Sequence, residues 1–404
     1  MAEGNRFVNI DFIQSALRET DIDGWLFFDF RRSNPIAYAV LGLPAQGLFS
    51  RRWMYYLPRE GEPVALTSAV ESHVLGGLPG RQRVYRTWQD YQQQLAEMLK
   101  GARKVAMEYV PENGIPYISR VDAGTVELVR ALGPEVVSSA DIAQRFEAVL
   151  TPAQIESHRQ AGRALQRVFQ HLCEWLREQL LSGATLTEYD TQQKALQLMA
   201  AERLHVDPSD MPLVAINGNA ANPHYSPQPI GSSPLGQGDL LLLDFSAPLE
   251  GDSNIFADYT WMVYLGKQVP ERIATLFAII RDARDTGTHF LEQSMAAHRR
   301  IEGWEVDDEV RKVVAGSGYG DYFVHRTGHS IGGPMVHGNG ANFDNLETHD
   351  TRQILRSTCT SIEPGIYLPD EGLGLRTEVD VLVLPEGIEV TGTPAQMEVL
   401  ALLT

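Results

Sequence analysis

Five residues in the second half of the chain have the types and surroundings of metal ligands: Asp244, Asp258, His329, Glu363 and Glu378. The four carboxylates lie beside strand-like apolar runs, where an ionised side chain is costly unless a cation or a hydrogen-bond donor meets it. Four carboxylates and one imidazole form an oxygen-rich set, which suits Mn²⁺, Mg²⁺, Fe²⁺ or Co²⁺ better than an ion that prefers thiolates. Because the set exceeds the needs of one ion, it indicates two ions, which in such sites lie about 3.5–4 Å apart.

The two aspartates are expected to share a β-hairpin. Asp244 follows four leucines, and Asp258 begins the apolar run of residues 258–262. If these runs pair, both carboxylates lie at one end of one sheet. Asp252, in the segment between the runs, is a rival for the second aspartate ligand. Asp258 is favoured because Asp-Tyr-Thr opens a strand.

The other three candidates lie next to glycine or at the boundary of a strand-like run. Glu363 precedes a Pro-Gly pair, Glu378 enters the apolar run of residues 379–383, and His329 follows a glycine that lets the backbone approach closely. Each acid alone is weak evidence, because the chain has 52 Asp and Glu residues and a lone acid at a strand end is more often a cap or a surface charge. The order and the local contexts of the residues carry the prediction together.

These segments resemble the M24 "pita-bread" metallopeptidases, in the branch that contains prolidase and aminopeptidase P. The resemblance extends over the whole chain, because that branch also has an N-terminal α/β domain of about this size. The segments that carry it are, in the family's order, Asn217-Gly-Asn-Ala-Ala-Asn-Pro-His224, Leu243-Asp244, Asp258-Tyr-Thr260, His325-Arg-Thr-Gly-His329-Ser-Ile-Gly332, Ile362-Glu-Pro-Gly-Ile-Tyr367 and Arg376-Thr-Glu378.

The resemblance implies a role for each site residue. Asp244 and Glu378 would bridge two divalent ions. Asp258 would complete one metal site, and His329 with Glu363 would complete the other. The remaining candidates are expected to line the substrate pocket or to orient a ligand, namely His224, His325, His337 and Arg376. Arg376 is expected to orient Glu378 or to meet a substrate carboxylate, although an ordinary strand-edge charge is an equal alternative.

Three departures from the family pattern bear on these assignments. Asp244 and Asp258 are 14 residues apart, which is more than is usual, so the hairpin loop between them is expected to be longer. The segment before His337 is one residue longer than usual, which affects the placement of that histidine. Trp261 stands where arginine is common in the family, and this is expected to alter the support behind the ligands rather than metal loading.

The resemblance implies hydrolysis of the amide bond before a proline. In this hypothesis a metal-bridging hydroxide attacks the peptide carbonyl, and Glu363 carries the proton to the leaving nitrogen. The leading reading is a prolidase, an Xaa-Pro dipeptidase with two Mn²⁺ ions, with Co²⁺, Zn²⁺ or Fe²⁺ as alternatives. The rival within the class is aminopeptidase P, which acts on longer peptides. Two other classes are a hydrolase of a non-peptide small molecule and a metal-free binding module.

The remaining sequence is expected to form two domains that position this site. In residues 1–150, short apolar runs typical of strands alternate with segments whose apolar residues have helical spacing. This pattern predicts an α/β domain. Residues 151–404 begin with a capping box at Thr151-Pro-Ala-Gln154 and mix helices with strands. The helix that this box opens is expected to stop at Ser182-Gly183. A second helix is expected to start at Thr185, with Glu188 completing another capping box, and to run to about Arg203. This second part is expected to be the α+β catalytic pita-bread domain, with a mainly antiparallel curved sheet flanked by helices.

Bulk properties limit the partners. The net charge of −18 argues against nucleic acid as the main partner. No apolar run approaches the roughly 20 residues that span a bilayer, and the first residues lack the apolar core of an export signal. We therefore expect a cytoplasmic enzyme with no membrane partner. The family resemblance further implies a homodimer and a small peptide substrate.

Overall fold

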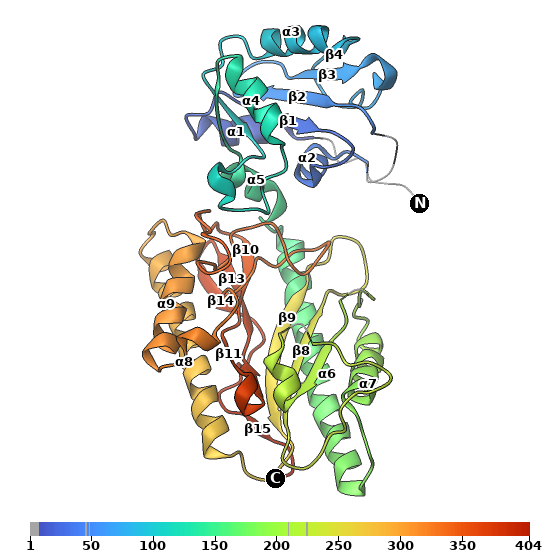
Figure 1. Cartoon of the computed structure of the whole chain (residues 1–404), viewed down its shortest axis with the longest axis vertical. Coiled ribbons are helices and arrows are strands. Elements are labelled where there is room, and N and C mark those ends of the chain that lie inside the picture. The colour runs from blue at the N-terminus through green and yellow to red at the C-terminus, as the bar shows by residue number, and fades with distance from the viewer. Residues whose placement is uncertain (1–7, 45–46, 48, 209, 224) are drawn as a thin grey trace. The chain divides into compact units, whose positions relative to one another are not determined.

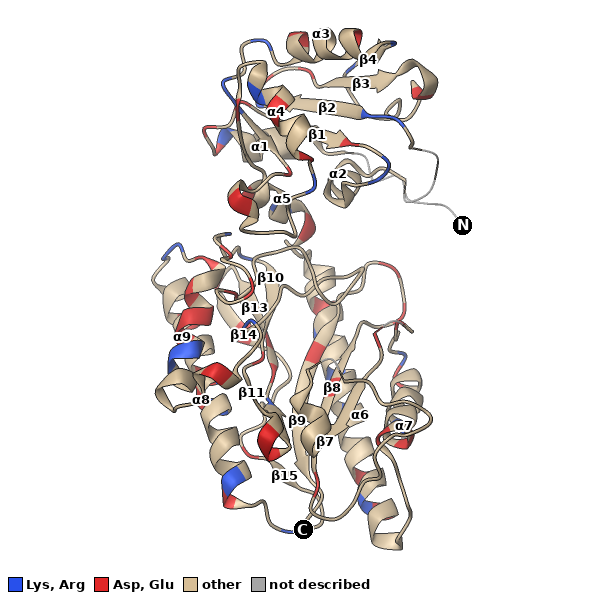
Figure 2. Cartoon of the chain, viewed as in Figure 1, with Lys and Arg blue, Asp and Glu red and all other residues tan. Residues whose placement is uncertain are grey.

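The computed structural model describes residues 8–404 except 45–46, 48, 209 and 224. The chain divides into two compact units, Met1–Glu147 and Ala148–Thr404 (Figure 1). Basic and acidic residues are interspersed over the helices and loops of both units (Figure 2). Among the described residues, no helix is both long enough and apolar enough to cross a bilayer.

The first unit is built on a six-stranded mixed sheet with strand order β4-β3-β2-β1-β5-β6. Its strands are β1 (Gly24–Asp29), β2 (Trp53–Pro58), β3 (Val64–Ser68), β4 (Arg81–Tyr85), β5 (Lys104–Met107) and β6 (Glu135–Ser138). Its helices are α1 (Ile10–Arg18), α2 (Pro35–Leu41), α3 (Trp88–Met98), α4 (Ala123–Ala131) and α5 (Ala140–Glu147). Two apolar clusters, one built around Trp25 and Trp53 and the other around Leu26 and Leu95, form its core. This is the α/β organisation that the sequence predicts.

The second unit contains three small sheets. The first has the order β15-β9-β8-β7, the second β10-β13-β14, and the third pairs β11 with β12. Apart from the parallel pair β15–β9, neighbouring strands are antiparallel. The strands are β7 (Leu213–Ile216), β8 (Leu240–Ala247), β9 (Ala257–Tyr264), β10 (Thr358–Ile362), β11 (Gly365–Leu368), β12 (Leu373–Arg376), β13 (Val379–Leu384), β14 (Gly387–Val390) and β15 (Leu400–Ala401). The predicted α+β class with mainly antiparallel strands is confirmed.

Four long helices flank these sheets: α6 (Pro152–Ser182), α7 (Glu188–Ala201), α8 (Glu271–Ala296) and α9 (Gly303–Gly316) (Figure 1). The capping box at Thr151 and Gln154 is present, and α6 ends before Gly183 in the left-handed conformation, as predicted. The predicted start of α7 at Thr185 is wrong. The N-cap is Thr187, whose side chain accepts from the Asp190 amide.

Candidate metal centre and active site

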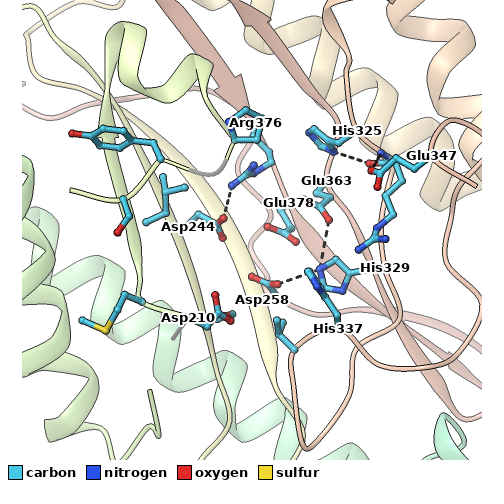
Figure 3. Close-up of a pocket in the computed structure, with 18 of the residues that line it drawn as sticks. Asp210, Asp244, Asp258, His325, His329, His337, Glu347, Glu363, Arg376 and Glu378 are labelled. Atoms are coloured by element: carbon cyan, nitrogen blue, oxygen red, sulfur yellow. Dashed lines mark hydrogen bonds and ion pairs between the residues drawn. The ribbon is translucent and has the colours of Figure 1, made fainter. Parts of the chain in front are cut away.

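A cavity of about 630 Å³ lies in the second unit and contains all five predicted metal ligands (Figure 3). The ligand side chains come from separate elements: β8, β9, the loop before β10, the turn after β10 and the turn before β13. Segments more than a hundred residues apart in sequence therefore meet in one place. Other residues that line the cavity include Asp210, Met211, Ser246, His325, Arg326, His337, Glu347 and Arg376.

The predicted hairpin of the two aspartates is present. In the antiparallel pair β8–β9, Asp244 lies opposite Thr260 and Ser246 lies opposite Asp258. Side chains alternate along a strand, so this register directs both carboxylates to the same face of the sheet. Asp252 lies in the loop between the strands, where it is exposed and is not among the residues that line the cavity. The structure therefore brings Asp258, rather than Asp252, to the other candidate ligands.

Ser361 on β10 positions two of the ligands. Its hydroxyl accepts a hydrogen bond from the His329 amide at 3.0 Å and donates one to Glu363 Oε1 at 3.2 Å. The Ser361 amide also donates to the His329 carbonyl at 2.9 Å. Gly328 makes this approach feasible, since a Cβ there would lie 1.8 Å from the Ser361 carbonyl oxygen.

Thr260 and Arg376 position the other carboxylates. The Thr260 hydroxyl donates to Glu378 Oε2 at 2.8 Å and accepts from Arg376 Nε at 3.1 Å. The Arg376 guanidinium also donates from Nη2 to Asp244 Oδ2 and from Nη1 to the Tyr367 hydroxyl. Arg376 is nearly fully buried. The arginine thus orients Asp244 directly and Glu378 through Thr260.

The ligand atoms are close enough to share metal ions. One ligand atom from each of Asp258, His329 and Glu378 lies within 4.8 Å of the others. His329 Nε2 lies 3.4 Å from Asp258 Oδ2 and 3.6 Å from Glu363 Oε1. Among the described residues, buried Glu378 Oε1 has no hydrogen-bond partner. A buried carboxylate oxygen without a donor is the feature that a divalent cation would satisfy, so the residues fit a metal centre.

The pKa values reflect the crowding of these carboxylates. Burial, followed by the negative charge of Asp244, raises the pKa of Asp258. Burial, followed by the charges of Asp258 and Glu363, raises the pKa of Glu378. Burial also raises the pKa of Glu363 and lowers that of His329. Each of these pKa shifts favours the uncharged form of the side chain. A cation bound in the cluster would favour the ionised form of the carboxylates and so lower their pKa values.

The three predicted pocket histidines have different positions. His224 lies outside the described residues. His337 lines the cavity, and its ring packs edge-on against His329 with 4.1 Å between the ring centroids. His325 also lines the cavity, and its Nε2 is 2.8 Å from the Tyr367 hydroxyl. Burial and the charge of Arg376 lower the pKa of His325 to about 3, so His325 is neutral in the folded protein.

Several residues that contact the candidate ligands or line the cavity were not predicted from the sequence. Thr260 and Tyr367 lie inside segments that carry the family resemblance. Their closeness in sequence to Asp258 and Glu363 could have indicated that they belong to the site. Asp380 and Asp210 had no such signal. Asp380 Oδ2 accepts a hydrogen bond from the Asp258 amide at 2.8 Å. Asp210 lines the cavity from the irregular segment between α7 and β7.

The prediction that Trp261 alters the support behind the ligands is not reflected in its contacts. Trp261 lies between Thr260 and Met262 on β9, and alternation directs its side chain away from the face that carries Asp258. Its ring stacks on Phe169 of α6, with 4.6 Å between the centroids and an interplanar angle of 12°. The tryptophan is part of the apolar core beneath α6.

Comparison with known proteins identifies the family. Residues 156–385, more than half of the chain, match metallopeptidase family M24. The chain is 24% identical over 268 residues to the uncharacterized peptidase YqhT of Bacillus subtilis, a match that covers 66% of this chain and 68% of the relative. It is 28% identical over 251 residues to the Xaa-Pro dipeptidase of Lactobacillus delbrueckii, which covers 62% of this chain but only 61% of that enzyme.

Solved structures share the fold over nearly the whole chain. The dipeptidase PepE from Mycobacterium ulcerans superposes with a TM-score of 0.67 at 21% identity and covers 97% of this chain and 96% of its own. The prolidase from Thermococcus sibiricus gives a TM-score of 0.62 at 20% identity, covering 99% of this chain and 100% of its own. The second unit therefore has the pita-bread fold, and an α/β unit precedes it in the chain.

Proposed function

Because the chain belongs to metallopeptidase family M24, and is thus a peptidase, we propose that it is a prolidase that hydrolyses Xaa-Pro dipeptides. The observation that carries the proposal is the convergence of Asp244, Asp258, His329, Glu363 and Glu378 in one cavity. A dipeptide also presents a free carboxylate, which needs a cationic partner. Arg326 lines the same cavity. The likeness to an Xaa-Pro dipeptidase supports the same substrate class.

Asp244, Asp258, His329, Glu363 and Glu378 would together hold two divalent ions. Divalent ions held there would act as Lewis acids and lower the pKa of bound water. The oxygen-rich ligand set suits several divalent ions, so we propose Mn²⁺ from the family resemblance, with Co²⁺, Zn²⁺ and Fe²⁺ as the alternatives. The homodimer implied by the family resemblance and the cytoplasmic location expected from the sequence belong to the same proposal.

The chain's own residues would bind the substrate and move the proton. Glu363 lies beside His329 at the cavity surface, and its carboxylate is placed to carry a proton from the attacking water to the leaving nitrogen. His337 lines the cavity and would supply a hydrogen-bonding group for the peptide carbonyl. His325 also lines the cavity, but its two ring nitrogens already bond the Arg326 carbonyl and the Tyr367 hydroxyl, so we assign it a positioning role. Tyr367 contacts both His325 and Arg376, which holds these side chains in fixed orientations. His224 is kept as a candidate from its sequence position alone.

The test is hydrolysis of Ala-Pro and of Ala-Pro-Ala, at equal concentration, by the full-length protein loaded with Mn²⁺. Asp244→Ala is the control, and it should lose activity toward any peptide that the wild type cleaves. Cleavage of the dipeptide with little of the tripeptide would support the prolidase. The reverse result would identify an aminopeptidase P. Cleavage of neither peptide by protein that holds two ions would contradict the proposed cleavage before proline and indicate a different amide or small-molecule substrate.

A further inference from the structure

Asp210 is an acidic side chain in the cavity that the proposed set of metal ligands does not use. It lies in the segment between α7 and β7, next to Met211, which also lines the cavity. Figure 3 shows Asp210 on the side of the ligand group formed by Asp244 and Asp258. The residue is therefore available to a substrate that occupies the cavity.

Two carboxylates, those of Asp244 and Asp207, act on the charge of Asp210. Asp210 is exposed within the cavity, and partial desolvation, followed by these two charges, raises its pKa. A hydrogen bond with the Ser246 side chain and the proximity of His329 only partly oppose this effect. A carboxylate in such a place would be stabilised by a cation that arrives with the substrate.

The opposite side of the cavity has two arginines, Arg326 and Arg376, together with the carboxylate of Glu347. In Figure 3, His325, Glu347 and Arg376 lie across the ligand group from Asp210. Arg326, whose backbone amide donates to Glu347 at 2.9 Å, lines the cavity there. The candidate ligands lie between the two sides. A small peptide has a cationic amino end and an anionic carboxyl end, so this arrangement of charges matches a zwitterion whose scissile bond lies at the ligands.

We propose that Asp210 is a specificity residue that receives an ammonium group of the substrate residue before the scissile bond. The inference rests on the proposed peptidase function and extends it, because it gives the substrate a direction in the cavity and a preferred charge. An ammonium group in that residue has two sources. One is the α-amino group, which every dipeptide has, and the other is the side chain of lysine.

The experiment compares full-length wild type with Asp210→Asn, which keeps the shape of the side chain but removes its charge. Asp252→Asn is the matched control, because it removes an exposed carboxylate from the nearby hairpin loop without touching the cavity. The probes are lysyl-proline and norleucyl-proline, which differ in the side-chain ammonium. Dissociation constants are measured by calorimetry on the metal-free protein, and kcat/KM on the Mn²⁺-loaded enzyme, with metal content determined for each variant.

Loss of a charge-assisted hydrogen bond should weaken binding by about tenfold or more. If the lysine side chain is the source, Asp210→Asn weakens lysyl-proline alone. If the α-amino group is the source, the variant weakens both peptides equally. Asp252→Asn should change neither affinity.

Two outcomes would overturn the inference. Equal affinities in wild type and Asp210→Asn, including no binding by either protein, would mean that Asp210 receives no cation. Loss of a metal ion in Asp210→Asn would make Asp210 a ligand instead. Failure of the proposed function is a separate result. If the loaded enzyme cleaves neither peptide but Asp210→Asn still weakens binding, the ammonium site stands and the prolidase proposal falls.

Discussion

At the scale of single residues, hydrogen bonds from neighbouring side chains fix the orientation of the candidate ligands. Ser361 holds the His329 backbone and the Glu363 carboxylate, and Thr260 joins Arg376 to Glu378. Such partners set the rotamer of a ligand before any ion binds, and their loss typically lowers metal affinity by about 10- to 100-fold. The ligands alone therefore do not define the site.

Thr260 allows this effect to be tested with matched variants. Thr260→Val has nearly the same shape but neither donates to Glu378 nor accepts from Arg376, whereas Thr260→Ser retains the hydroxyl. We expect Thr260→Val to lower metal affinity by about 10- to 100-fold and Thr260→Ser to stay close to wild type. Titration of the chelated protein with Mn²⁺ measures both. Equal affinities in the two variants would show that the hydroxyl has no role in ordering Glu378.

Glu378 should make the metal-free protein less stable as the pH rises. Its folded pKa is raised by burial and by neighbouring carboxylates, so the folded state retains a proton that the unfolded state has lost. The stability associated with that proton is present below the unfolded pKa of about 4.3. It is lost as the pH rises through the folded pKa, by about 1.4 kcal/mol for each pH unit between the two values.

Glu378→Gln removes this titration, so its advantage over wild type in the metal-free state should grow as the pH rises from 5. The difference between the two proteins cancels the titration of the buried histidines, which they share. Urea unfolding in the presence of a chelator, repeated from pH 5 to pH 8, measures the difference. Added Mn²⁺ should reverse the order of stability, because the variant has lost a proposed ligand. A difference that does not change with pH would contradict the raised pKa of Glu378.

At the scale of elements, Asp380 connects two sheets that each present a proposed ligand. It lies on β13, just after Glu378, and its Oδ2 accepts from the backbone amide of Asp258 on β9. Its other oxygen, Oδ1, is buried without a hydrogen-bond partner among the described residues. Burial and the charge of Asp258 raise the pKa of Asp380 well above its usual value.

The two sheets should therefore tolerate Asp380→Asn but not Asp380→Ala. Asparagine retains an oxygen that accepts from the Asp258 amide. Alanine leaves that buried amide unsatisfied, which costs about 1–3 kcal/mol. The free energy of unfolding, measured by denaturant titration of both variants, provides the comparison. If both variants lose the same stability, the hydrogen bond to Asp258 does not hold the two strands together.

Local sequence signals, such as a capping box or a terminal glycine, correctly predicted the helix ends that depend only on neighbouring residues. The box at Thr151 and Gln154 marked the start of α6, and Gly183 marked its end, because both signals act within one turn. The start of α7 was wrong because Thr185 and Thr187 both fit a capping pattern. Tertiary contacts decide between them: Glu188 is fully buried and accepts hydrogen bonds from the Ile216 amide and the Tyr225 hydroxyl, so it is not the box residue.

Elements without a local signal were missed for similar reasons. β4, Arg81–Tyr85, is a largely polar strand at the edge of its sheet, so it lacks the apolar alternation of a half-buried strand. A helix was expected before Gly316, and only the start of α9 had no conventional signal, because its N-cap is Glu302 in place of the usual serine or threonine. The ligand set was recognisable because its residues lie inside conspicuous motifs. Asp210 was not, because only the folding of the segment before β7 brings it into the cavity.

At the scale of the whole molecule, each unit has its own buried core. Trp25, Leu26 and Trp53 belong to the clusters of the first unit, whereas the proposed ligands all belong to the second. A metal ion that binds only the folded second unit adds stability to that unit by mass action, about 2.7 kcal/mol at a free concentration of one hundred times the Kd. Metal binding should not directly change the free energy of unfolding of the first unit, because that unit contains none of the proposed ligands.

Calorimetry of the full-length protein should therefore resolve a metal-dependent and a metal-independent contribution to unfolding. We expect saturating Mn²⁺ to raise the Tm of the transition that belongs to residues 148–404 and to leave the other unchanged. Leu26→Ala assigns the transitions, because the loss of a fully buried leucine costs about 2–5 kcal/mol and should lower the Tm of the first unit. Asp244→Ala should remove the shift caused by Mn²⁺ without affecting the transition that Leu26→Ala lowers. If Mn²⁺ raises both transitions equally in wild type, the two units unfold as one cooperative body and the metal stabilises the whole chain.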